Sequence, residues 1–277
     1  LMSTALMQCY MEEHGVKSVL LPALDFMRTL DSGEPDMQHI QVRLRRLIDL
    51  EPDAELFLTQ GYICRNDHGG IDNLKRGGSD YTASILGAVL DAEEIQIWTD
   101  IDGMHNNDPR YVEGTKPVST LHFEEAAELA YFGAKILHPA CVLPAKLHNI
   151  PIRLLNTLDP EAHGTLICNN MPDGKLKAVA AKDNITAIKI KSGRMLLAYG
   201  FLHKVFETFE KHRTSIDMMA TSEVGVSVTI DDDSHLASIV DDLKHFGTVT
   251  VDRDMVIICV VGDLEWENCN LTAYPCE

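Results

Sequence analysis

The apolar positions in the first part of the chain alternate between runs that fit helices and short runs that fit buried strands. Helix-forming residues fill positions 3–14, a strand is expected over 16–21, and positions 38–50 repeat apolar residues near the helical period. A compact apolar run covers 56–63, and a polar loop is expected over 66–75. Strands that alternate with helices of this length favour a mainly parallel sheet covered on both faces.

The same alternation continues to about residue 168. Ser79 and Asp80 are candidates to cap a helix that runs to residue 92, and a buried strand follows at 95–98. Residues 100–110 are rich in Asp, Asn, Gly and Pro, which predicts a loop or hairpin. Two more helices are expected at 123–132 and 139–148, and two closing strands at 151–155 and 165–168.

A polar stretch with Pro and Gly at 169–177 is interpreted as a linker between domains. Beyond it the pattern has the βαββαβ order of a small ferredoxin-like module, with elements expected at 185–190, 202–212, 215–220, 225–230, 235–246 and 248–251. A last apolar strand at 255–261 is interpreted as the possible start of a second copy. The predicted domains are therefore 1–170 and 178–262, with a tail at 263–277.

Composition places the chain among soluble globular proteins, since 45% of residues are hydrophobic and 24% are charged. A net charge of −18 argues against a nucleic-acid partner. The apolar runs are broken before the length of about 18 residues that a membrane span needs, and there is no secretory leader pattern, so a cytoplasmic location is expected. Seven scattered cysteines without CxxC pairs or metal-like spacing predict isolated buried thiols and no metal-ligating side chains.

The strongest local motif is Arg76-Gly77-Gly78-Ser79-Asp80, between a loop and a helix. Glycines let the backbone approach a ligand, the helix start offers free N–H groups, and an arginine binds a carboxylate with two parallel hydrogen bonds. A small anion would fit there. The alternative is a glycine turn with a Ser/Asp cap and a solvent-exposed arginine, and the pentapeptide alone leaves both open.

Two further motifs suggest a nucleotide site. Trp98-Thr99-Asp100 ends a predicted strand, and Asp108-Pro109-Arg110 follows in the next loop, so together they can hold a nucleotide and its phosphates. Asp-Pro-Arg is also a common turn sequence. Lys135, before His138-Pro139, is either a point charge for a phosphate or a solvated lysine at a helix end.

The strings TQGYI, RGGSDYTA, IWTDIDG with DPR, and EEAAELAYFGAKILHP, in this order, resemble the aspartate kinases of the amino-acid-kinase family. The resemblance runs to about residue 262 and separates the chain from kinases for glutamate, acetylglutamate, carbamate and UMP. It implies a three-layer αβα sandwich with a mainly parallel sheet, followed by a ferredoxin-like ACT domain. The implied reaction is ATP + L-aspartate to 4-phospho-L-aspartate + ADP, the first step of lysine, threonine and methionine biosynthesis.

The resemblance also implies residue roles. Arg76 would bind the substrate α-carboxylate, Asp80 would organise the reacting groups, and Lys135 would lie near the transferred phosphoryl group. The remaining substrate contacts would be Tyr62, Gly77, Gly78 and Ser79, and the remaining nucleotide contacts Thr99, Asp100, His105, Arg110 and Ile136. His105 stands where many relatives carry Tyr. The substrate carboxylate is already a nucleophile, so the site has to align two anions and neutralise charge with cations and Mg²⁺, which needs no dedicated protein cage.

The ACT domain implies an allosteric effector, and MMATSEVGVS resembles the lysine-inhibited, monofunctional members of the family. Ala198 departs from the Ser that relatives carry. The effector contacts implied are Met195, Ala198, Gly200, Phe201, Leu202, Ser215, Ile216, Asp217, Thr221, Ser222 and Glu223. Alternatively, Asp217 and Glu223 are simply exposed turn acids. ACT domains pair edge to edge, so a homodimer or a higher assembly is expected.

One departure leaves alternatives open. The family begins with a Lys-Phe-Gly-Gly strand that contacts the phosphates, and this chain starts at Leu1 without it. Because Leu1 falls inside an element, we expect further residues upstream in the natural protein. The alternatives are a kinase-like amino-acid sensor that has lost catalysis, and a sister kinase for another carboxylate.

Overall fold

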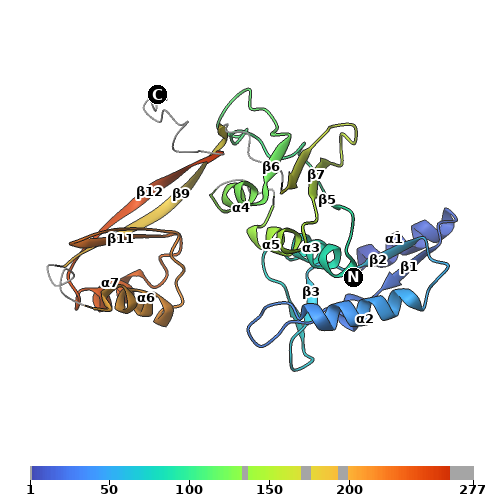
Figure 1. The fold of residues 1–277 in the computed structure, drawn as a ribbon, viewed down its shortest axis with the longest axis horizontal. Coiled ribbons are helices and arrows are strands. Elements are labelled where there is room, and N and C mark those ends of the chain that lie inside the picture. Colours follow the sequence, from blue (N-terminus) through green and yellow to red (C-terminus); the bar gives the residue numbers. More distant parts are fainter. Residues whose placement is uncertain (1, 133–136, 170–175, 193–198, 263–277) are drawn as a thin grey trace. The chain divides into compact units, whose positions relative to one another are not determined.

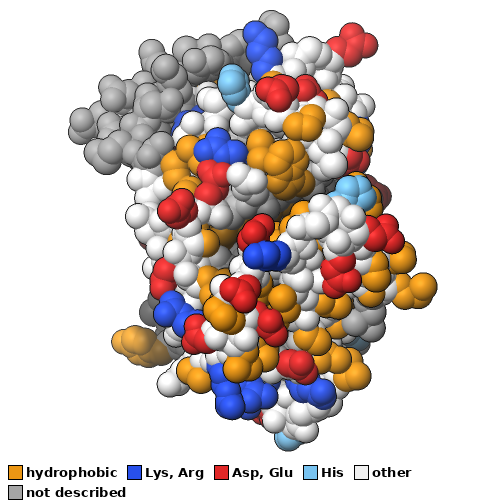
Figure 2. All heavy atoms as spheres, turned by 90° about the vertical axis from the view of Figure 1, so that its right-hand side faces the viewer, with side chains coloured by type: hydrophobic (Ala, Val, Ile, Leu, Met, Phe, Trp, Pro, Cys, Tyr) orange, Lys and Arg blue, Asp and Glu red, His pale blue; other side chains and the backbone are white. Residues whose placement is uncertain are grey.

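The computed structural model describes residues 2–132, 137–169, 176–192 and 199–262. It contains two compact units, one formed by Leu1–Ala180 with the segment from Cys259, and one by Ala181–Ile258. In the described parts of the chain, no helix has the length and apolar character needed to cross a membrane. Acidic and basic side chains intermingle on the face drawn in Figure 2, so the negative net charge forms no uniformly acidic surface there.

The first unit begins with the predicted order of helix, strand and helix. Its elements are α1 (Met2–Glu13), β1 (Ser18–Leu21), the short 3-10 helix η1 (Ala23–Asp25), α2 (Met37–Asp49) and β2 (Leu56–Thr59). The strands β1 and β2 pair in parallel. Asp36 caps α2, since its carboxylate accepts a hydrogen bond from the backbone N–H of His39 at 3.0 Å. The buried side chains of Phe26, Met27 and Ile40 form the core of this region.

The predicted polar loop at 66–75 contains a short strand, because β3 (Ile63–Arg65) and β4 (Ile71–Asn73) form an antiparallel hairpin. The next helix, α3 (Gly78–Leu90), starts earlier than predicted. Gly77 is its N-cap in the left-handed conformation, and the carbonyl of Gly77 accepts a hydrogen bond from the backbone N–H of Tyr81 at 2.9 Å. Ser79 and Asp80 therefore lie inside the first turn, and the prediction that they cap the helix is wrong.

A four-stranded sheet forms the rest of this unit, in the order β5-β7-β8-β6 (Figure 1). β5 pairs with β7 and β6 with β8 in parallel, whereas β7 and β8 are antiparallel. The core of this part includes apolar side chains of the sheet and of two helices. The elements are β5 (Ile95–Thr99), β6 (Thr120–His122), α4 (Phe123–Phe132), α5 (Pro139–His148), β7 (Ile152–Asn156) and β8 (Thr165–Cys168). β6 was not predicted, because three residues carry no readable periodicity.

The second unit has the predicted βαββαβ order, with the sheet order β10-β11-β9-β12. Val205 and Phe209 of α6 and Ile239 and Leu243 of α7 are buried in one core with sheet residues such as Ile188. The elements are β9 (Leu176–Lys191), α6 (Phe201–Lys211), β10 (Met218–Ser222), β11 (Gly225–Ile230), α7 (Leu236–Leu243) and β12 (Thr248–Gly262). β9 is thus longer than predicted.

The strands expected at 248–251 and 255–261 are one strand, β12. Asp254 has a φ of 55°, a local irregularity that the strand accommodates, and Asp252 lies 2.7 Å from the ammonium of Lys189 on the neighbouring strand. The polar residues that suggested a break therefore lie within a continuous strand. Residues 255–261 are therefore the second half of β12, whose last part, from Cys259, belongs to the first unit, and the interpretation that they form a separate strand is wrong.

The described cysteines are free thiols, of which Cys64 and Cys141 are buried and Cys168 and Cys259 partly buried. Cys9 on α1 is exposed, so the prediction of buried thiols is wrong there. It failed because α1 has no buried residue.

We predict that Gly164→Ala destabilises the protein more than Gly114→Ala. Both glycines have positive φ, which costs another residue about 1 kcal/mol, but a Cβ at Gly164 would lie 1.9 Å from the carbonyl oxygen of Leu154, whereas Gly114 has open space. The expected difference in the free energy of unfolding is about 2 kcal/mol, measured by urea denaturation. Equal losses in the two variants would contradict the clash.

Candidate functional site

The loop before α3 is held in an unusual backbone conformation. Tyr62, Lys75 and Gly77 have φ values of 76°, 60° and 69°. The backbone N–H of Tyr62 donates to Oγ1 of Thr82 at 3.1 Å, and its carbonyl accepts from the N–H of Leu74 at 2.8 Å. Non-glycine residues with positive φ persist only where surrounding contacts enforce them, and they cluster at ligand sites.

The N-terminal ends of α3 and α5 lie against each other. A Cβ at Gly77 would be 2.2 Å from the Cβ of His138, the N-cap of α5, so only glycine fits. Nδ1 of His138 accepts a hydrogen bond from the N–H of Ala140 at 3.3 Å, and the hydroxyl of Ser84 on α3 donates to the carbonyl of Cys141. Two positive dipole ends therefore come together, an arrangement that favours a bound anion. At α5 the attraction rests on the dipole, because Pro139 has no N–H and the N–H groups of Ala140 and Cys141 are paired with His138.

Asp80 is the acidic group at this junction. It lies partly buried in the first turn of α3, and burial raises the pKa of its carboxyl, while the charge of His138 acts in the opposite direction. Burial also raises the pKa of the Cys141 thiol, and the neighbouring Asp80 adds to this effect. Cys141 therefore stays a protonated thiol and does not act as a nucleophile.

The guanidinium of Arg76 is available for a ligand. The side chain is exposed at the turn before Gly77, and it forms no hydrogen bond or ion pair with any residue that the structure describes. Ser79 is also exposed and lies close to Gly61, where an added Cβ would be 2.9 Å from its hydroxyl oxygen. The predicted substrate residues 76–80 and Tyr62 are thus brought together around one helix start.

Thr99 and Asp100 lie at the carboxyl end of β5. Their side chains are joined by a hydrogen bond of 3.0 Å, and the carbonyl of Thr99 accepts from the N–H of Thr157 at 2.8 Å. β5 and the parallel strand β7 end together at Thr99 and Asn156. Ligands of open α/β sheets bind at this edge, so the position of both residues suits a nucleotide.

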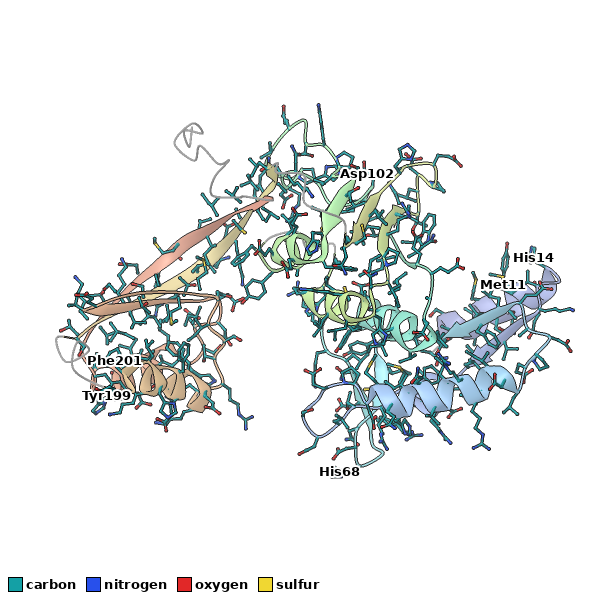
Figure 3. The ribbon with its side chains drawn as sticks, viewed as in Figure 1. Met11, His14, His68, Asp102, Tyr199 and Phe201 are labelled. Carbon is teal, nitrogen blue, oxygen red and sulfur yellow. The ribbon has the colours of Figure 1, made fainter. Side chains whose placement is uncertain are left out.

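The next loop keeps its charged side chains paired internally. His105 lies 2.6 Å from Asp102 through Nε2 and 2.9 Å from the hydroxyl of Thr115 through Nδ1, and only 14% of its side chain is exposed (Asp102 is labelled in Figure 3). Arg110 donates through Nε to both oxygens of Asp108 at 3.0 and 3.1 Å, which raises its pKa. In the described chain, these contacts bring neither side chain to Thr99 or Asp100.

Lys135 and Ile136 lie outside the described residues, as do Met195 and Ala198 of the expected effector site. The other effector candidates lie in the second unit. Gly200, with φ 80°, is the N-cap of α6, and Phe201 is the first residue of that helix (Figure 3). Phe201 is buried in the core of the second unit, against which Leu202 and Ile216 also pack. Ser215 is exposed, as are Thr221 and Ser222 at the end of β10 and Glu223 in the turn that follows.

Asp217 has an internal partner. The ammonium of Lys182 lies 2.9 Å from Asp217 and 2.9 Å from Asp231, and the Asp217 side chain is 1% exposed. Burial disfavours the charged form of Lys182, but its hydrogen bonds to Asp231 and Asp217 outweigh this and raise its pKa. Asp217 is therefore not an exposed turn acid, whereas Glu223 is exposed.

His138 was not among the residues predicted for the site. It stands in the string FGAKILHP, and the proline after it indicates a helix start, but the sequence does not show that this start meets Gly77. Among the described residues, no group of three or more His, Cys, Asp or Glu side chains is placed to hold a metal ion.

Comparisons of sequence and of structure with known proteins find relatives of one kind, the amino acid kinases. Residues 1–156 match the model of the amino acid kinase family. The chain is 37% identical to the chloroplastic aspartokinase 3 of Arabidopsis thaliana and 36% identical to the lysine-sensitive aspartokinase 3 of Escherichia coli, covering 95% of this chain in both cases and 50% and 61% of those proteins. A crystal structure of E. coli aspartokinase III with aspartate and ADP superimposes with a TM-score of 0.86 at 35% identity, covering 98% of this chain and 63% of that one.

We predict that His138→Asn raises the pKa of Asp80 further. Asparagine still caps α5, but the charge that favours the Asp80 carboxylate is removed. The pKa is measured by NMR titration of the carboxyl carbon. His148→Asn, at the other end of α5, is the control and should leave the pKa unchanged. An equal response to both substitutions would contradict the proximity of His138 and Asp80.

Proposed function

Because this chain belongs to the amino acid kinase family, with aspartokinases as its relatives, we propose that the protein transfers the γ-phosphoryl group of ATP to the side chain of L-aspartate. The products are 4-phospho-L-aspartate and ADP, the first step of lysine, threonine and methionine biosynthesis. The junction of the α3 and α5 N-termini beside the available Arg76 carries the proposal. Since the chain spans 50% and 61% of the two relatives, the activity is proposed for the whole protein.

On the substrate side, Arg76 binds the α-carboxylate of aspartate with two parallel hydrogen bonds. Gly77, Gly78 and Ser79 line the same pocket, where the N–H of Gly78 is already donated to the carbonyl of Lys75 at 3.2 Å, and Tyr62 packs against the substrate. The positive φ values of Tyr62 and Gly77 support this assignment, because contacts with Thr82 of α3 and with His138 fix these residues before a ligand arrives.

On the nucleotide side, Thr99 and Asp100 hold ATP at the carboxyl end of β5. Arg110 is paired with Asp108 in this structure. It reaches the nucleotide only if the loop that carries both residues changes conformation. His105 acts by fixing the loop through Asp102 and Thr115. Lys135 neutralises the transferred phosphoryl group, and Ile136 lines the site beside it.

The chemical step needs alignment and charge neutralisation. An oxygen of the aspartate side chain attacks the γ-phosphorus, and the bond to the oxygen bridging the β- and γ-phosphates breaks, so that ADP leaves with the electron pair. The substrate is ionised at neutral pH and needs no base. The two helix N-termini stabilise the negative charge, and Asp80 orients the groups around it.

Mg²⁺ bound together with ATP would neutralise part of the charge of the phosphates. Asp100 and Asp80 supply the hard oxygen donors that this ion prefers, and both belong to the proposed site.

The second unit is proposed to be an ACT domain that inhibits the enzyme when lysine binds. The E. coli relative is named lysine-sensitive, and exposed Thr221, Ser222 and Glu223 lie at one end of the sheet. Pairing through sheet edges would make a homodimer or a higher assembly in the cytoplasm. The domain boundaries at 1–170, 178–262 and 263–277 remain predictions.

We predict that Arg76→Ala raises the KM for aspartate about a hundredfold, which corresponds to about 3 kcal/mol for a lost charge-assisted hydrogen bond. ADP formation with aspartate, ATP and Mg²⁺ provides the measurement. Arg46→Ala, on the exposed side of α2, is the control and should leave KM unchanged. An unchanged KM in Arg76→Ala would remove the assignment, and an inactive wild type would favour the amino-acid sensor.

We also predict that L-lysine inhibits aspartate-dependent ADP formation and that D-lysine does so far less. Glu223→Gln should raise the lysine concentration for half-inhibition roughly tenfold, since one charge-assisted contact with an ammonium group is weakened. Glu210→Gln on α6 is the matched control, because Glu210 is exposed but lies outside the expected effector site. Equal lysine sensitivity in all three proteins would contradict the role of Glu223.

A further inference from the structure

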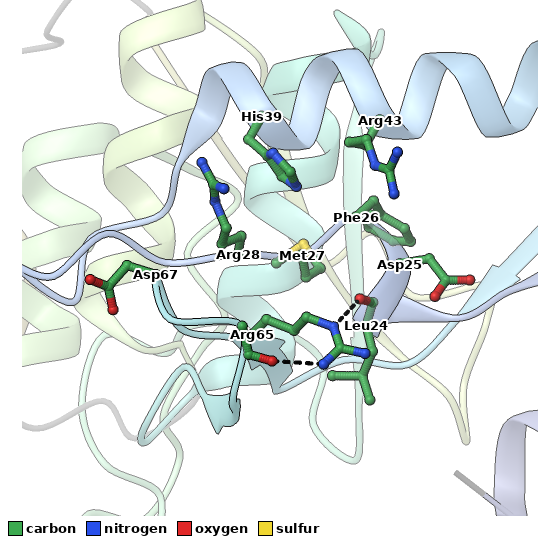
Figure 4. Close-up of a pocket in the computed structure, with 10 residues that line it drawn as sticks. Leu24, Asp25, Phe26, Met27, Arg28, His39, Arg43, Arg65 and Asp67 are labelled. Atoms are coloured by element: carbon green, nitrogen blue, oxygen red, sulfur yellow. Dashed lines mark hydrogen bonds between the residues drawn. The ribbon is translucent and has the colours of Figure 1, made fainter.

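A cavity of about 320 Å³ lies in the first unit, away from every residue assigned above (Figure 4). Its walls come from residues 24–28, from α2, and from the β3–β4 hairpin. The polar side chains that line it are Asp25, Arg28, His39, Arg43, Arg65 and Asp67. This volume is at the lower end of the range for small-molecule sites in proteins.

The fold brings four basic side chains to this cavity from separate parts of the chain. His39 and Arg43 are four residues apart on α2 and therefore share one face of the helix. Arg28 and Arg65 are partners in a parallel β-bridge, fixed by the hydrogen bond from the N–H of Thr29 to the carbonyl of Arg65 at 2.8 Å. Figure 4 shows Arg28, His39 and Arg43 on one side of the cavity and Arg65 on the other.

Two of the three guanidinium charges lack a carboxylate partner. Arg28 is paired with Asp36. Arg65 donates instead to two neutral carbonyls, of Leu24 at 2.9 Å and of Gly69 at 2.8 Å, which orient the guanidinium without cancelling its charge (Figure 4). Arg43 forms no ion pair with any residue in the described part of the chain.

The two lining acids do not neutralise these charges. Asp25 and Asp67 lie at opposite ends of the cavity, with their carboxylates turned away from its centre (Figure 4). Neither forms an ion pair with an arginine in the described structure. Arg43 and Arg65 therefore keep their positive charge unneutralised at the cavity, although the chain as a whole has a charge of −18.

His39 shows the effect of this environment. Burial lowers the pKa of its imidazole, and the charges of Arg28 and Arg43 lower it further, against the opposing effect of Asp36. A neutral imidazole still offers one N–H donor.

We propose that this cavity binds a small phosphate-bearing anion through Arg43, Arg65 and His39. Guanidinium groups match the geometry of phosphate oxygens, and an anion would relieve the repulsion between the clustered charges. The site shares no residue with the loop at Arg76, so it is a second ligand site and does not depend on the proposed kinase reaction.

Binding is tested by NMR titration of the His39 ring with inorganic phosphate, at an ionic strength matched with sodium chloride. The His39 pKa should rise when phosphate binds, because a nearby negative charge favours the imidazolium. Glycerol 3-phosphate tests a monoester in the same way. Tighter binding of the ester identifies a phosphorylated metabolite as the ligand class, and equal binding identifies the phosphate group itself.

Arg43→Gln should reduce phosphate affinity about tenfold or more, whereas Arg46→Gln, an exposed arginine on the same helix outside the cavity, should not change it. Phosphate bound at the nucleotide site would respond equally in both variants and would not move His39. An unchanged His39 pKa in the wild-type protein, or the same shift in both variants, would overturn the proposal.

Discussion

The contact between Gly77 and His138 is the interaction on which the candidate active site depends. It brings the positive ends of two helices together, and such an arrangement is electrostatically unfavourable unless an anion lies between them. The absent side chain at Gly77 allows the contact, and the hydrogen bond from Ser84 to Cys141 holds the helices in place. The phosphoryl group of ATP or a carboxylate of aspartate, the substrates of the proposed reaction, would relieve the repulsion between the two helix ends.

Elsewhere in the chain, too, charged side chains differ in whether the fold gives them a partner of opposite charge. Several ionic groups have a partner within the fold, as Asp217 has in Lys182 and Arg110 in Asp108. Arg76, Arg43 and Arg65 have no carboxylate partner among the described residues. In a chain with a net charge of −18, unpaired arginines at a helix start and in a cavity are the positions where external anions bind most favourably.

The two units show different relations between backbone and function. In the first, strained residues such as Tyr62 and Lys75 surround a helix start, and a buried core fixes them. In the second, regular strands and two helices form a separate core, and the described effector candidates lie near the start of α6, before β10, and at the end of β10 with the turn after it. Loops on a rigid scaffold can carry a ligand site without weakening the core beneath them.

The sequence by itself determined most of the element types, though not β4 and β6, together with the βαββαβ order and the bounds of α4, α5 and β11. Local periodicity and helix signals such as Pro139 act within a few residues. The sequence also supplied the family resemblance and the loop at Arg76. Tertiary structure alone decided that His138 meets Gly77, that Asp217 pairs with Lys182, and that β12 is continuous beside β9. Those features arise from contacts between residues distant in the chain, and spacing along a sequence does not specify them.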